Sequence, residues 1–185
     1  MFESDFVQSW KTRFYVNDSA ASDVVAFTQE LPIAPFGLST NTTTIRVPFK
    51  SIRLKKVEMW CNYRESKGIV GNTINLTLVE RRSVRPLEYS DTATFAKCAH
   101  IVRKFSKFDT VGWFYSTTIS EVNPELRFQM PKGSVLELTY DYVISDGDAV
   151  PSFGTTGLTA DRIYTNSMNT DLDVIGRSYE TQFLI

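Results

Sequence analysis

Short segments in which apolar and polar residues alternate recur along this chain, and they constrain its fold more than any other feature. The clearest is residues 51–62 (SIRLKKVEMWCN), where apolar residues occupy every second position on both sides of the pair Lys55-Lys56. A period of two places alternate side chains on one face of a strand, whereas an amphipathic helix needs a period of 3.6. One β-bulge at the lysine pair would keep the apolar side chains on a single face. We therefore predict a long, bulged strand here.

Similar runs rich in Val, Ile, Thr, Phe and Tyr, separated by clusters of Gly, Pro, Asn, Asp and Ser, predict a chain built almost entirely of strands. With 185 residues, 42% of them hydrophobic, one domain spanning residues 1–185 can bury a full core. Loops are expected at residues 36–44, 62–72, 81–94 and 146–160. The expected strands are residues 9–16, 24–31, 51–62, 73–80, 96–104, 110–116, 125–130 and 135–145, with short late strands at 162–165 and 174–175.

This spacing predicts an all-β fold, namely a single eight-stranded antiparallel jelly roll. A jelly roll is a β-sandwich with a double Greek key, and here it would carry long inter-strand loops. Loops of more than about ten residues usually serve a function. In a protein that assembles with copies of itself, they would make contacts between subunits.

The formal charge of −1 hides an uneven distribution. Residues 45–107 hold fourteen Lys or Arg against five Asp or Glu, whereas residues 1–44 sum to −3 and residues 108–185 to −7. A basic centre between acidic ends is typical of a protein that meets a polyanion on one face, or copies of itself at edges of opposite charge. The simpler interpretation is that these charges only keep the domain soluble.

Two basic clusters follow predicted strands. Clustered cations favour phosphates, and Phe105, which lies within the second cluster, could stack on an unpaired base. Solvated loop flanks explain the same residues equally well. We predict low-specificity nucleic-acid binding by Arg81, Arg82, Arg85, Arg103, Lys104 and Lys107.

Residues able to carry catalysis or hold a metal are sparse, so we expect no enzyme and no cofactor. The single histidine, His100, lies in a strand pattern without a serine-hydrolase motif, and one histidine cannot build a multi-histidine metal site. Cys61 and Cys98 have no metal-ligand spacing and are expected to be free thiols. Asp146 and Asp148 offer only a weak possibility of calcium. Residues 131–134 (PKGS) are expected to form a tight turn rather than a phosphate loop, and no apolar run is long enough for membrane insertion.

Several short segments, in a shared order, resemble capsid proteins of circoviruses and related circular single-stranded DNA viruses. The first is a proline-aromatic pair that precedes a basic strand ending in Trp60. In Asp161-Arg162, this sequence has Asp161 where a glycine would be more usual. The similar segments are residues 47–60 (VPFKSIRLKKVEMW), 89–93 (YSDTA), 99–100 (AH), 112–114 (GWF), 130–135 (MPKGSV), 142–147 (YVISDG) and 162–166 (RIYTN).

The resemblance, which covers roughly residues 45–170, implies the capsid protein of a small icosahedral virus, located in the virion. It would assemble with about sixty copies of itself into a T=1 shell around a small single-stranded genome. Related folds also serve RNA viruses, so the genome could be DNA or RNA. The family usually begins with an arginine-rich arm, whereas this sequence begins with acidic Glu3 and Asp5, which puts genome binding in doubt rather than shell formation.

Two other classes of protein stay open at this point. One is a monomeric jelly-roll module that binds a carbohydrate or a receptor, which would need a concave aromatic groove. The other is a β-sandwich hydrolase, which would need two carboxylates at catalytic spacing in a cleft. Exposed aromatics, expected at Trp10, Tyr63 and Phe153, fit contacts between subunits.

Overall fold

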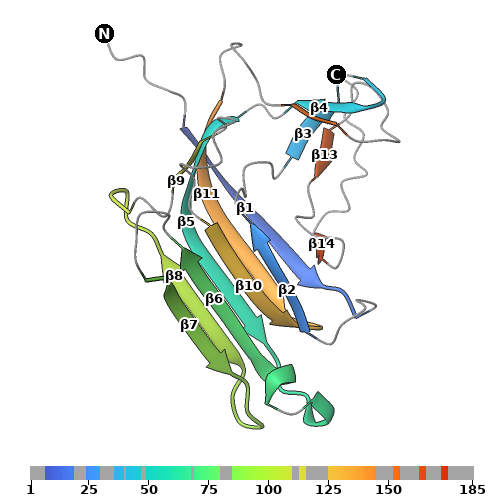
Figure 1. Ribbon diagram of the computed structural model, residues 1–185, viewed down its shortest axis with the longest axis vertical. Coiled ribbons are helices and arrows are strands. Elements are labelled where there is room, and N and C mark those ends of the chain that lie inside the picture. Colours follow the sequence, from blue (N-terminus) through green and yellow to red (C-terminus); the bar gives the residue numbers. More distant parts are fainter. Residues whose placement is uncertain are drawn as a thin grey trace.

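A computed structural model of the protein describes most of the sandwich and six short outlying strands (Figure 1). The described residues are 7–18, 24–29, 36–39, 41–46, 49–67, 69–79, 85–109, 113–115, 125–144, 152–154, 163–165 and 172–174. Within them lie fourteen strands and two 3-10 turns, and every strand pair is antiparallel.

Eight strands form two facing sheets of four. The first sheet has the order β1 (Val7–Val16), β11 (Val135–Ile144), β5 (Phe49–Cys61) and β8 (Ala99–Lys104). The second has the order β2 (Val24–Gln29), β10 (Glu125–Pro131), β6 (Thr73–Val79) and β7 (Leu87–Thr92). Numbered from one to eight along the chain, these strands run 1-8-3-6 in one sheet and 2-7-4-5 in the other. That order is a double Greek key, so the predicted jelly roll is confirmed.

Six further strands extend the eight. In the first sheet, β14 (Leu172–Val174) pairs with β1, and β9 (Trp113–Tyr115) pairs with β5. A separate sheet has the order β12 (Ser152–Gly154), β4 (Thr44–Arg46), β3 (Phe36–Ser39) and β13 (Ile163–Thr165). This small sheet lies beyond one end of the sandwich (Figure 1).

Three expected loops therefore contain strands. Residues 36–44 contain β3 and the turn that joins it to β4 in a hairpin. In this turn, the Asn41 side chain accepts a hydrogen bond from the Thr43 amide (2.8 Å). Residues 81–94 contain β7, whose polar sequence LEYSDT has weak strand propensity and is held by pairing with β6. Residues 146–160 contain β12, which is only three residues long.

The predicted bulge is confirmed. Opposite β5, Thr139 pairs with Lys56 and Tyr140 pairs with Leu54, so Lys55 is the extra residue. The bulge keeps Ile52, Leu54, Val57 and Met59 all on the buried face, each with no exposed surface.

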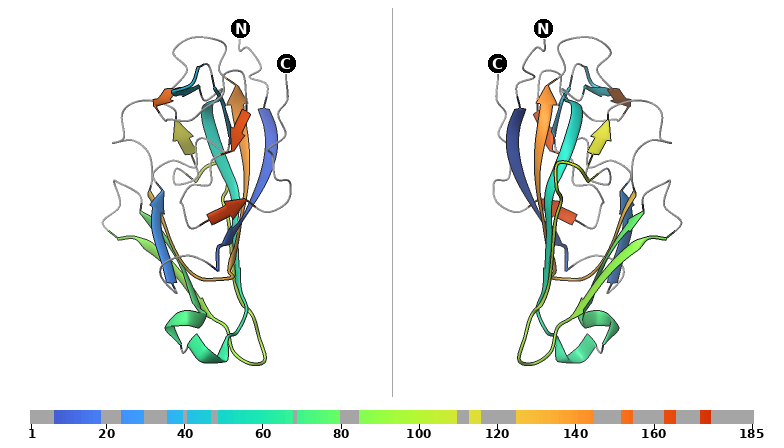
Figure 2. Two further views of the ribbon diagram at one scale, coloured as in Figure 1. Left: turned by 90° about the vertical axis from the view of Figure 1, so that its right-hand side faces the viewer. Right: turned by 90° about the vertical axis from the view of Figure 1, so that its left-hand side faces the viewer.

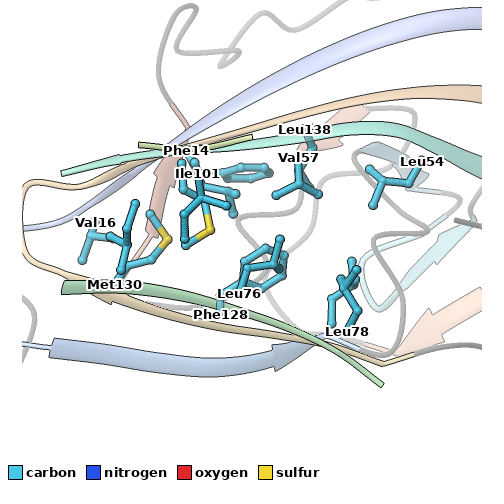
Figure 3. Close-up of a cluster of buried hydrophobic side chains, with 14 of the residues drawn as sticks. Phe14, Val16, Leu54, Val57, Leu76, Leu78, Ile101, Phe128, Met130 and Leu138 are labelled. Carbon is cyan, nitrogen blue, oxygen red and sulfur yellow. The ribbon is translucent and has the colours of Figure 1, made fainter. Parts of the chain in front are cut away.

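The core fills the space between the two sheets (Figure 3). Phe14, Leu138 and Ile101 of the first sheet face Leu76 and Phe128 of the second. Alternate residues of β6 are buried, as its sequence predicts. Tyr140 brings a hydroxyl into this core and shares a hydrogen bond of 2.8 Å with Thr12.

The sandwich is a wedge. Seen from the side, the sheets converge at the end that carries the 3-10 turns η1 (Glu65–Lys67) and η2 (Val70–Asn72), and they diverge toward the other end (Figure 2). The expected tight turn at residues 131–134 is confirmed at the narrow end. Gly133 has a φ of 78°, in the left-handed region that favours glycine, and it lies against the Arg64 guanidinium.

Candidate functional site: a basic sheet face and an apolar tip

The predicted nucleic-acid-binding residues are only partly brought together. Arg81 and Arg82 lie outside the described residues. Arg85 is exposed just before β7, and Lys104 is exposed at the end of β8. The start of β7 and the end of β8 lie toward the wide end of the sandwich but on opposite sheets, which diverge there (Figure 2). Lys107 is exposed in the turn that follows β8.

Arg103 and Phe105 point inward rather than toward a ligand. The Arg103 guanidinium lies over the rings of Phe105 (5.4 Å) and Tyr89 (5.8 Å) and is 3.7 Å from the Asp109 carboxylate. Phe105 is only 9% exposed, so the expectation that it stacks on a base is wrong. The exposed ring in this segment is that of Phe108, which Lys107 covers at 5.0 Å.

The outward side of the first sheet carries a denser set of charges than either predicted cluster. Along each strand, these residues alternate with buried core residues, and strand pairing places them side by side. We call this surface the basic face. Its described cations are Lys11, Arg13, Arg53, Lys55, Lys56 and Lys104, and its described carboxylates are Glu58, Glu137 and Asp141.

The carboxylates of the basic face lie beneath the cations. Glu137 is buried and contacts Lys11 and Arg13 (2.7 Å each) and Lys56 (3.7 Å). The Lys11 and Arg13 side chains keep 55% and 49% of their surface exposed, against 2% for Glu137. The face that meets solvent is therefore positive.

Asp141, four residues after Glu137 on β11, has a similar arrangement of partners. It accepts hydrogen bonds from Ser9 and Arg53 and lies 3.3 Å from the Lys55 ammonium. Burial by itself would raise the pKa of Asp141, but these hydrogen bonds outweigh it and hold the pKa below its ordinary value. The pKa of Glu137 is lowered in the same way, because hydrogen bonds from Lys11 and Arg13 outweigh the effect of burial.

Three lysines gather where β5 bulges. Lys56 and Lys104 occupy directly opposed positions on β5 and β8, and the bulge adds Lys55 beside them. Like charges directly opposite each other destabilise a sheet. Lys56 is partly compensated by a hydrogen bond to Glu58, which raises the pKa of Lys56.

An aromatic pair stands at the β8 edge of the same face. The rings of Trp60 and His100 are stacked, with centroids 5.4 Å apart and planes 8° apart. His100 Nε2 lies 3.0 Å from a Glu58 oxygen, and its backbone amide donates to Asp91 (2.8 Å). These contacts hold the His100 ring in place at the edge of the sheet.

The narrow end of the wedge carries an apolar tip, which we define as Tyr63, Ile69 and Phe95. Ile69 and Phe95 are 78% and 93% exposed, although their loops are held firmly. The buried Asn72 side chain bonds both backbone groups of Arg64 (2.6 and 2.9 Å).

The turn that presents Phe95 is closed by two backbone hydrogen bonds between Thr94 and Lys97 (2.8 and 3.1 Å). Of the exposed aromatics expected from sequence, Trp10 and Tyr63 are confirmed, whereas the Phe153 side chain lies outside the described side chains.

Other candidate residues were also located. Both cysteines are free, Cys61 buried and Cys98 exposed. Asp146 and Asp148 lie outside the described residues. Within the described part of the chain, no group of three metal-binding side chains is found, and no helix has the length and apolar character to cross a membrane.

No family model and no curated protein matches this sequence. Among solved structures, the chain is similar to one from the virus-like particle of the giant freshwater prawn Macrobrachium rosenbergii extra small virus. The TM-score is 0.42 and the identity 10%, over 80% of this chain and 84% of that one. It is also similar to chains of Desmodium yellow mottle tymovirus (TM-score 0.39, 10% identity, 77% and 91% covered) and of the empty head of turnip yellow mosaic virus (0.40, 7%, 80% and 87%). At this level of similarity, the jelly-roll assignment rests on the strand order of the chain itself.

Proposed function

We propose that this protein is the shell-forming capsid protein of a small icosahedral virus. About sixty copies would close a T=1 shell around a single-stranded genome, and the protein would reside in the virion. The observation that carries this proposal is the apolar tip at the narrow end of a jelly-roll wedge. The resemblance of residues 45–170 to circovirus-like capsid proteins points to the same role, with DNA as the genome.

The tip has the properties of a contact between subunits. Exposing large apolar side chains to water is unfavourable, so covering them with another surface lowers the free energy of the system. Because the loops are already fixed by hydrogen bonds, burying Ile69 and Phe95 costs little conformational entropy. Wedges brought together at their narrow ends would bury these side chains around a symmetry axis, where many modest contacts add up.

Size measurement of the purified protein tests the proposal. Light scattering and negative-stain microscopy should show particles of uniform size in moderate salt. The double substitution I69S/F95S should shift the population toward small species. F108S is the matched control, because it removes a comparably exposed phenylalanine from the turn after β8.

Two results would overturn shell formation. One is a monomer in every salt and pH condition, which would favour the carbohydrate- or receptor-binding module. The other is an I69S/F95S variant that assembles as well as F108S. Circular dichroism of each variant shows whether the sandwich is intact.

Low-specificity nucleic-acid binding is part of the same proposal. Arg81, Arg82, Arg85, Arg103, Lys104 and Lys107 remain its sequence-based candidates. The inward contacts of Arg103 favour the exposed members of this set. The proposal assigns the chain no catalytic step.

A further inference from the structure

We infer that the basic face binds the phosphate backbone of single-stranded nucleic acid, with the Trp60–His100 pair receiving a base. This inference deepens the proposed function, because it names the surface that would meet the enclosed genome. It departs from the sequence prediction, which placed that contact before β7 and around the end of β8 and which shares only Lys104 with the basic face.

The first support is the excess of cations that face solvent. The described part of the basic face holds six lysines or arginines against three carboxylates. The carboxylate side chains are 2–14% exposed, whereas Lys11, Arg13 and Lys55 are 44–55% exposed. An approaching phosphate therefore meets ammonium and guanidinium groups first, and the carboxylates hold those groups in place from below.

The second support is the lysine cluster at the bulge. Lys56 and Lys104 face each other across the strand pair, and Lys55 precedes Lys56 at the bulge, with its ammonium group 3.3 Å from Asp141. Of these three lysines, Lys55 and Lys56 contact carboxylates in the part of the chain that the structure describes. A bound phosphate would relieve the repulsion that the sheet otherwise retains.

The third support separates nucleic acid from other polyanions. A sulfated glycan offers negative charge but no flat base. The basic face offers both cations and, beside Lys56 and Lys104, an aromatic pair whose His100 side chain is 41% exposed. A charged track beside an aromatic platform is how proteins bind single strands without reading their sequence.

The test is a set of fluorescence anisotropy titrations with labelled oligothymidylate, and in parallel with a labelled heparin oligosaccharide, over a series of salt concentrations. For K55Q/K104Q, the slope of log affinity against log salt should fall by about 1.4, or about 0.7 for each lost phosphate contact. The matched control is K67Q/K97Q, which removes the same formal charge at the narrow end and should leave the slope unchanged.

The aromatic platform has its own pair of variants. H100A should weaken oligothymidylate binding by about fivefold or more, because a stacked base is lost. H100F keeps a ring and should retain the affinity. Neither variant should change heparin binding.

Two results would overturn the inference. Equal slopes for K55Q/K104Q and K67Q/K97Q would remove the basic face as the phosphate site. If H100A and H100F bind oligothymidylate equally well, and the protein also binds the heparin oligosaccharide in the parallel titration, the ligand of the basic face would be a sulfated polyanion rather than nucleic acid. Measuring the size of the same samples keeps the two proposals apart. If the protein is a monomer but the salt slope of K55Q/K104Q falls as expected, only the shell proposal is wrong. If the protein forms particles but the salt slope of K55Q/K104Q does not change, only the proposed nucleic-acid face is wrong.

Discussion

On the outward faces of the two sheets, side chains link neighbouring strands through different chemistry. The first sheet joins its strands through the ion pairs of the basic face. The second joins them through neutral groups: Thr73 bonds Thr92 (2.9 Å) and Asn75 bonds Gln129 (3.0 Å). Among its described outward side chains, Arg127 and Glu88 are the charged ones.

The difference shows that neutral pairs can link neighbouring strands of this sandwich as ion pairs do. Both sheets are antiparallel and bury one side in the same core, and hydroxyl and amide pairs hold the second. Buried carboxylates cost desolvation free energy that the neutral pairs avoid. We therefore assign the exposed cations of the first sheet to the proposed binding and the carboxylates beneath them to folding, and the predictions below test that division.

Acid should separate the two faces most strongly. The folded pKa values of Glu58, Glu137 and Asp141 are lowered, because hydrogen bonds from their cation partners outweigh burial. Their contribution to stability is therefore complete above the ordinary carboxylate pKa of about 4 and is lost as pH falls through the lower folded values. Thermal unfolding between about pH 5 and 2.5 should show a steep fall in Tm.

The control for acid sensitivity is E137Q/D141N, whose amides do not titrate in this range. Its Tm should be lower than that of the wild type at pH 5 but should fall less steeply below it. Parallel curves for the two proteins would mean that the carboxylates beneath the cations do not control acid stability.

A single carboxylate should matter more than a single amide. E137A removes charge-assisted hydrogen bonds from Lys11 and Arg13 and leaves Lys56 with Glu58 alone, so it should cost about 2–3 kcal/mol of unfolding free energy. N75A, the matched change on the second sheet, should cost about 1 kcal/mol. Urea unfolding, under conditions where sizing shows one species, gives both values. Equal costs would contradict the distinction between the faces.

Much of the fold could be predicted from the sequence, because a strand that buries one face has apolar residues at every second position. The bulge could be read from Lys55-Lys56 for that reason. β7 was not predicted, because LEYSDT has only two large hydrophobic residues, Leu87 and Tyr89, and its pairing with β6 completes the strand.

The candidate site was harder to predict than the fold. Glu137 and Asp141 alternate visibly along β11, but their partners come from β1 and β5, and a single sequence does not say which strands are neighbours. Phe105 was a different kind of error. The series Ala99, Ile101, Arg103 and Phe105 has a period of two, and following it one residue past β8 predicts that Phe105 is buried.

The smallest expected effect tests the central claim about the lysine cluster. If Lys104 is retained for binding, it costs stability, because it faces Lys56 across the strand pair. K104T should therefore raise the unfolding free energy by a few tenths of a kcal/mol, since threonine removes the like charge and suits a strand. The same variant should bind oligothymidylate more weakly. K97T, a change at another exposed lysine, breaks the contact of Lys97 with Asp91 (3.4 Å) and should not raise stability. A gain in stability with a loss of binding is the combination expected of a residue kept for function. A K104T variant that is less stable than the wild type would show instead that Lys104 stabilises the first sheet.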